Sequence, residues 1–155
     1  MFKGAVRALD VPEQRGSGYP EPFRSRMGDR VKRRLGNAFG LTQYGVNLVR
    51  LAPGRQSALR HFHSHEEELL YLLEGELVLI TNGGEQLMSA GMCVGFPANT
   101  GDAHHLVNRS DAAAVYLEIG SRIDADNGHY PDDDLCWVAD GTGGVIGAHK
   151  NGAPY

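Results

Sequence analysis

The chain has few of the residues and runs that mark several large protein classes. It contains only two cysteines, Cys93 and Cys136, too few for a disulfide framework, so we expect two ordinary thiols. Its longest uncharged apolar stretch is far shorter than a membrane span. Residues 1–10 carry charges at Lys3, Arg7 and Asp10 and lack the apolar centre of a signal peptide. We therefore expect a cytoplasmic protein with no membrane partner.

A strong charge of one sign is also missing. The formal net charge of the 155 residues is only -4, which gives no reason to expect binding to nucleic acid. Hydrophobic residues at 41% and charged residues at 22% are ordinary for a globular protein. We expect one domain over residues 1–155, with its core at about 41–120, an arm at 1–40 and a tail at 121–155.

Glycine, in contrast, is plentiful at 21 residues, and the apolar stretches between glycines are short. Asn82-Gly83 is a strong signal for a two-residue hairpin turn. Strands spaced about 8–12 residues apart with such turns indicate a β-sandwich or barrel. The strands we expect cover residues 44–51, 57–63, 68–73, 76–81, 86–88, 92–96, 104–108 and 113–119.

Both ends of the chain lack such patterns. Residues 1–35 are polar and interrupted by proline and glycine, which predicts an irregular arm with at most a short helix near Arg30–Leu35. Its end is basic, and we expect a solvated face or subunit contact there, with an anion site as the alternative; the basic residues are Arg24, Arg26, Arg30, Lys32, Arg33 and Arg34. We expect an irregular tail, a solvated turn at Asp132-Asp133-Asp134, and Trp137 packing the tail onto the body.

Two histidine clusters stand out from this background. His61 and His63 alternate, so in an extended strand both side chains point to the same face, where they could meet one metal ion. An acidic residue, Glu68, follows five positions after His63. About 40 residues on lies the second cluster, His104 to Asn108.

With these clusters the chain resembles the cupin superfamily. Its first motif matches His61-x-His63, four residues, Glu68, six residues, Gly75, although Gly54 lies one residue farther from His61 than usual. Its second motif matches in two parts with a longer loop between them: Gly91 and Pro97, then Gly101, His104 and Asn108. The resemblance covers about residues 41–120 and implies a double-stranded β-helix, or jelly-roll, barrel. The fold class we expect is accordingly all-β.

The motif spacing chooses among neighbouring candidates. Of three successive glutamates only Glu68 is separated from Gly75 by six residues, and His65 then falls in the connecting turn. His104 is preferred to His105 because it shares a strand face with Asn108. The resemblance thus implies His61, His63, Glu68 and His104 as metal ligands.

Three imidazoles and one carboxylate suit one divalent ion such as iron, manganese, zinc, nickel or copper. Beside them, strand parity predicts an apolar inner wall of Leu70, Leu72 and Leu106. Tyr71 should point outward and pack against other layers. Asn108 is expected to form hydrogen bonds at a strand end instead of binding the metal.

The resemblance implies two kinds of function. The first is a metalloenzyme acting on a small molecule, an isomerase, dioxygenase or lyase. A sugar-phosphate isomerase would need a phosphate clamp, for which Arg50 and Arg60 are candidates, although Arg60 faces away from His61 by parity. The second is a non-catalytic protein that binds or senses a small molecule through its metal. A purely apolar pocket would favour the second kind and converging polar groups the first.

We also expect a homodimer, in which roughly residues 20–50 pack along a neighbour's sheet and cover its edge. The alternative is that the arm folds back on its own barrel and the protein stays monomeric.

Overall fold

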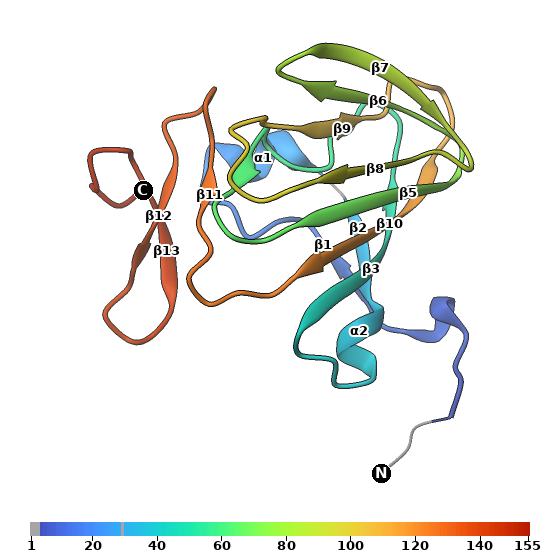
Figure 1. Ribbon diagram of the computed structural model, residues 1–155, viewed down its shortest axis with the longest axis horizontal. Coiled ribbons are helices and arrows are strands. Elements are labelled where there is room, and N and C mark those ends of the chain that lie inside the picture. The colour runs from blue at the N-terminus through green and yellow to red at the C-terminus, as the bar shows by residue number, and fades with distance from the viewer. Residues whose placement is uncertain (1–3, 29) are drawn as a thin grey trace.

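Two antiparallel sheets form most of the computed structural model, which describes residues 4–28 and 30–155 (Figure 1). The large sheet has six strands in the order β1 (Glu13–Arg15), β2 (Val31–Arg34), β3 (Tyr44–Leu51), β10 (Ala114–Ser121), β5 (Glu68–Glu74) and β8 (Cys93–Phe96). The smaller sheet has the order β7 (Gly84–Ser89), β6 (Glu76–Thr81) and β9 (His105–Val107). This arrangement is the jelly-roll fold that the sequence predicts.

The alternation of apolar residues places the main core between these sheets. On β5, Leu70 and Leu72 are buried, and Leu106 is buried on β9. The predicted inner wall is therefore confirmed. The main core consists of Val49, Leu51, Leu70, Leu72, Leu77, Leu79, Met88, Leu106, Ala114 and Tyr116. Tyr71 points outward as expected, but it is 38% exposed instead of packed against another layer.

Tight turns set the register of the central strands. Thr81 pairs with Gly84, so Asn82 and Gly83 form the two-residue loop between β6 and β7 that was predicted. Gly75 joins β5 to β6 with a φ of 80°, in the left-handed region that glycine adopts without strain.

The N-terminal arm is more regular than its sequence indicates. It contains a 3-10 turn (Ala8–Asp10), β1, a short helix α1 (Phe23–Met27), β2 and a short helix α2 (Leu35–Ala38). The predicted helix near Arg30–Leu35 is wrong: residues 31–34 form a strand and the helix begins at Leu35. The reason is tertiary, because β2 pairs along β3 and thereby extends the large sheet.

The expected strand at residues 57–63 is also largely absent. Only β4 (Phe62–His63) is a strand, and it pairs with β11 (Gly128–His129). Single bridges from Gln56 to Val107 and from His61 to His104 attach the preceding loop to the smaller sheet. Hydrogen bonds to β9 and the residues beside it therefore satisfy the backbone N–H and C=O groups of this loop, although no continuous strand pairing forms.

The tail forms a hairpin of β12 (Cys136–Ala139) and β13 (Val145–Ala148), at the left of Figure 1. A second apolar cluster joins it to the body and contains Phe23, Met27, Leu59, Tyr130 and Leu135, with Tyr19 and Trp137 packed against it. Trp137 thus packs the tail onto the body, as predicted.

The three aspartates lie in a turn with Asp132 and Asp134 exposed, as expected, and each also forms an ion pair. Asp132 pairs with Arg60, Asp133 with Arg26 and Asp134 with His149, and these pairs help to fix the tail. No helix in the described part of the chain is long and apolar enough to cross a membrane.

Candidate metal centre

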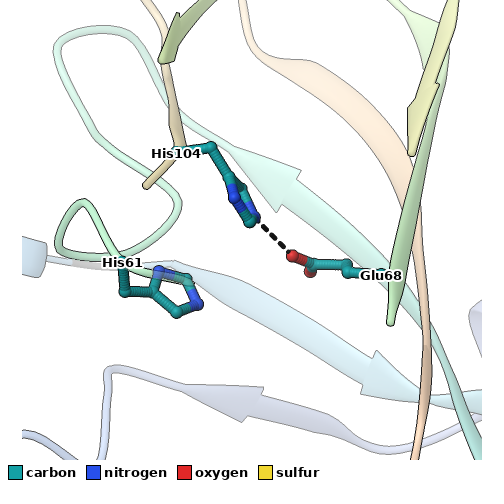
Figure 2. Close-up of side chains that lie close together, drawn as sticks. All are labelled: His61, Glu68 and His104. Carbon is teal, nitrogen blue, oxygen red and sulfur yellow. Dashed lines mark hydrogen bonds and ion pairs between the residues drawn. The ribbon is translucent and has the colours of Figure 1, made fainter. Parts of the chain in front are cut away.

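Three of the four predicted ligands meet inside the barrel (Figure 2). Glu68 begins β5 and has the same parity as the buried Leu70 and Leu72, so its side chain faces inward. His61 and His104 lie opposite each other in the loop–strand bridge, where their backbones exchange two hydrogen bonds of 3.2 and 2.8 Å. This bridge presents both imidazoles to Glu68.

The donor atoms of these residues lie close enough to share one ion. One donor atom from each of His61, Glu68 and His104 lies within 4.8 Å of the other two. His104 Nε2 and Glu68 Oε2 are 2.8 Å apart. His104 is 2% exposed, so bulk water does not compete at this nitrogen.

His63, the fourth predicted ligand, lies next to this group. Its ring centroid is 4.9 Å from that of His61. Its Nδ1 is 2.6 Å from Asp126 Oδ2, and it belongs to a second group of possible ligands with Glu66 and Asp126. Asp126 also accepts hydrogen bonds from the backbone N–H groups of His65 and Glu66, so we interpret this second group as the frame that holds His63.

The histidine contacts fit a metal that binds through Nε2. Nδ1 of His61 is 2.8 Å from the carbonyl oxygen of Leu59, and Nδ1 of His63 is held by Asp126. A proton on each Nδ1 leaves the Nε2 lone pair available, which is the arrangement typical of metal-binding histidines. His104 Nδ1 is buried with no hydrogen-bond partner among the described residues, and a parallel stack on Phe96, with centroids 3.4 Å apart, orients this ring instead.

Burial keeps His61 in the protonation state that metal binding requires. It lowers the pKa of His61 to about 4, and the neighbouring His63 and His104 act in the same direction against Glu68. His61 is therefore a neutral imidazole at neutral pH, and neutral imidazole is the form that binds metal.

The residues excluded by the motif spacing lie elsewhere. His65 is exposed in the connecting turn, with its ring near the hydroxyl of Ser64. His105 points away and its Nδ1 meets the carbonyl oxygen of Ala58. Asn108 is fully buried and its Nδ2 donates to Leu51 and Ala112, so its predicted hydrogen-bonding role is confirmed.

The three clustered donors and His63 line a cavity of about 340 Å³. Much of its wall is polar, and Lys32, Asn47, Tyr116 and Glu118 are part of it. Lys32 Nζ lies 2.5 Å from Glu118 Oε1, and Asn47 Nδ2 donates to the same oxygen at 2.9 Å.

The ionisation of these cavity groups follows from their neighbours. Burial raises the pKa of Tyr116 well above its ordinary value, so its phenol stays protonated. Burial also opposes ionisation of Glu118, but the charges of Lys32 and Arg30 outweigh it and lower the pKa of this carboxyl. Tyr116 thus offers the cavity a neutral phenol, and Glu118 offers it a carboxylate.

Neither arginine proposed from the sequence as a phosphate clamp belongs to this lining. Arg50 is exposed on β3, where it alternates with the buried Val49 and Leu51 and therefore faces outward. Arg60 is bound at 2.6 and 2.8 Å by both oxygens of Asp132. The cations that line the cavity are Arg30, Lys32, Arg34 and Arg122. The sequence contained a signal for Arg30, Lys32 and Arg34, because they are alternate residues and alternate residues of a strand share one face.

Comparison with known proteins agrees with this architecture. The Cupin domain profile matches residues 47–120. The crystal structure of a sugar phosphate isomerase from a cupin superfamily of Silicibacter pomeroyi is 39% identical, with a TM-score of 0.91, over 98% of this chain and 96% of that one. The chain belongs to the cupin superfamily.

Two further cupin relatives widen the comparison. An Acidithiobacillus ferrooxidans protein, provisionally named a sugar phosphate isomerase, is 27% identical over 97% of this cupin and 95% of its own chain, with a TM-score of 0.79. Tetracenomycin polyketide synthase protein TcmJ of Streptomyces glaucescens is 31% identical over 78 residues, and this cupin spans only 50% of its length.

Proposed function

We propose that this cupin is a divalent-metal enzyme that acts on a small molecule, and that His61, His63, Glu68 and His104 hold the metal. The observation that carries the proposal is the convergence of His61, Glu68 and His104 within 4.8 Å in a polar cavity. A divalent ion held there would act as a Lewis acid toward a carbonyl or hydroxyl oxygen.

Isomerisation of a phosphorylated sugar is the reaction that we favour. The supporting observation is likeness over nearly the whole chain to a protein named a sugar phosphate isomerase, at 39% identity. Such a reaction moves a proton between neighbouring carbons, which needs groups that give and take protons beside the metal. Tyr116 and Glu118 line the same cavity and differ in protonation, as this chemistry requires.

The polar lining also bears on the rival function, a binding or sensing protein without turnover. A purely apolar pocket would favour that function, whereas Lys32, Tyr116 and Glu118 make the lining of this cavity polar and support an enzyme. Transfer of deuterium from solvent to the sugar carbons, followed by NMR, distinguishes the two functions because only turnover produces it.

Metal analysis tests the ligand set directly. The protein is purified without chelators or a nickel column, and its metal content is measured by mass spectrometry. We expect His63→Ala to lose stoichiometric metal, because it removes one of four ligands. His65→Ala, its matched control in the exposed turn, should keep it. Equal losses from both variants would show that the assigned ligand register is wrong.

We also propose that this cupin is a homodimer. The arm pairs with its own sheet through β2 and β3, as in the alternative considered from the sequence. The outer face of the large sheet nevertheless exposes Leu69, Tyr71 and Leu73 at 41%, 38% and 40%. Three large apolar side chains in a row on one strand face support a contact between two copies.

A further inference from the structure

Four cations line the cavity, and they differ in what already binds them. Arg30 donates to the carbonyl oxygen of Ser57, and Lys32 is paired with Glu118. Arg34 is exposed, and no hydrogen-bond or ion-pair partner of its side chain is found among the described residues 4–28 and 30–155. Arg34 is therefore the cation of the lining with its charge available to a ligand.

Arg122 complements Arg34 because its guanidinium is already fixed in place. Its Nη1 donates to the carbonyl oxygen of Leu41 at 2.9 Å, and its Nη2 donates to Asn37 Oδ1. A guanidinium has five N–H donors, so three remain for a ligand. A donor held before binding loses little side-chain entropy when the ligand arrives.

Gly45 and Gly120 have no side chains, so the part of the sheet between these arginines and the metal centre, called here the Gly45–Gly120 floor, carries no side chain at these positions. Across the large sheet Glu68 pairs with Gly120, and Gly120 pairs with Gly45. A Cβ at Gly45 would lie 3.6 Å from Nε of Arg122, which places that guanidinium directly above Gly45. Two strand spacings separate Glu68 from Gly45, about 10 Å.

The charge on Arg34 and Arg122 indicates which kind of ligand group fits. Two guanidinium groups match a dianionic phosphate monoester better than a singly charged carboxylate. The other lining carboxylates are engaged in part: Glu118 by Lys32, and Glu66 by the backbone N–H of Ile123. The exposed Glu67 is the acidic neighbour that a phosphate group would have to tolerate.

We propose that Arg34 and Arg122 form an anion subsite that binds the phosphate of a phosphorylated small molecule, across the Gly45–Gly120 floor from the metal centre. This proposal rests on the function proposed above for the orientation of the substrate, with its reacting end at Glu68 and its phosphate at the arginines. The subsite itself needs no metal, because the positive charge of both guanidinium groups is supplied by the protein chain.

The test measures binding of inorganic phosphate to the chelator-treated full chain by calorimetry, with acetate as the singly charged comparison. The variants are Arg34→Gln and Arg122→Gln, and the control is Arg50→Gln, an exposed arginine on the outer face of β3. We expect phosphate to bind wild type and the control equally, and each cavity variant at least tenfold more weakly. Acetate should bind all forms weakly.

Thermal melting accompanies each measurement because Arg122 also holds the loop before β3. If Arg122→Gln fails to fold, Arg34→Gln decides the question alone, since the Arg34 side chain has no partner to lose among residues 4–28 and 30–155. Equal phosphate affinity in wild type and Arg34→Gln, or equal affinity for acetate and phosphate, would overturn the subsite.

Metal content is measured on the same protein samples before chelation. Phosphate binding by Arg34 without stoichiometric metal would refute the metalloenzyme and leave the subsite standing. Stoichiometric metal without phosphate binding would refute the subsite and leave the metalloenzyme standing.

Discussion

Asp126 fixes the protonation of His63 from a position far along the chain. Its Oδ2 lies 2.6 Å from His63 Nδ1, while Oδ1 accepts the backbone N–H groups of His65 and Glu66. These contacts lower the pKa of Asp126 to about 2 despite the opposing effect of burial, so it is a carboxylate at neutral pH. A carboxylate accepts a hydrogen bond from Nδ1–H of His63 and leaves Nε2 of this ring free to bind a metal.

Asp126→Asn should therefore weaken metal binding without unfolding the protein. The amide oxygen can still accept the two backbone N–H groups, but the amide nitrogen favours the opposite tautomer of His63. We expect a loss of about 10–100-fold in metal affinity, as is typical for such supporting contacts. Titration against a competing chelator measures it, with Asp124→Asn in the same exposed turn as the control. Unchanged affinity would mean that His63 does not bind the metal through Nε2.

Glu118 should make stability depend on pH in the acid range. Its folded-state pKa is lowered by Lys32 and Arg30, so its contribution is present above the unfolded value of about 4.3 and disappears as pH falls through the folded value. Glu118→Gln leaves Lys32 without its partner and should cost about 2 kcal/mol at pH 7.

Urea unfolding of the chelator-treated protein at several pH values measures this effect. The difference between wild type and Glu118→Gln should shrink steadily below about pH 4. Glu85→Gln, which breaks the exposed pair with Arg109, should change stability little at any pH. A difference that does not depend on pH would show that the Glu118 charge is not the cause.

At the scale of elements, Gly75 holds the turn between β5 and β6 against β10. Its φ is 80°, and a Cβ there would lie 3.0 Å from Cα of Ala114 and 3.1 Å from the carbonyl oxygen of Ala113. Gly75→Ala adds backbone strain and a contact with a neighbouring strand, so we expect a loss of about 2–3 kcal/mol.

Gly54→Ala is the matched control for this turn. Gly54 has a similar φ of 71°, but nothing lies within 4 Å of its Cβ position. It should lose only about 1 kcal/mol, the cost of the backbone conformation alone. Denaturant unfolding compares the two, and equal losses would show that the contact with β10 does not matter.

The elements also show where sequence reasoning works and where it stops. Strand β3 was predicted at residues 44–51 and lies there, because its apolar alternation is strong and local. Strand β2 was missed because basic side chains hide its alternation and its pairing partner β3 provides the stability. At the site, the motif spacing selected His61, Glu68 and His104, and the structure brings the donor atoms of these three residues together. Asp126 carries no such local signal, since it lies 63 residues from His63.

At the scale of the whole molecule, the outer face of β5 and β10 is a surface on which a second copy would fit. Leu69, Tyr71 and Leu73 lie on the outer face of β5, and Leu117 and Ile119 of the neighbouring β10 share the half-buried surface beside them. A two-fold contact there buries the same residues in both copies, so one self-complementary apolar face is enough to form a dimer. Because a single substitution is present in both copies, it changes the contact at two places and should disrupt the dimer strongly.

Light scattering after gel filtration tests the homodimer at micromolar concentrations. We expect a mass near twice the 16.8 kDa of one chain. Tyr71→Lys should shift the protein to monomer, because it brings two buried charges together at the contact. Leu87→Lys, at a 59% exposed position on β7 of the other sheet, should leave the dimer intact. A mass near 16.8 kDa at every concentration would rule out the dimer, and dissociation by both variants would place the contact elsewhere.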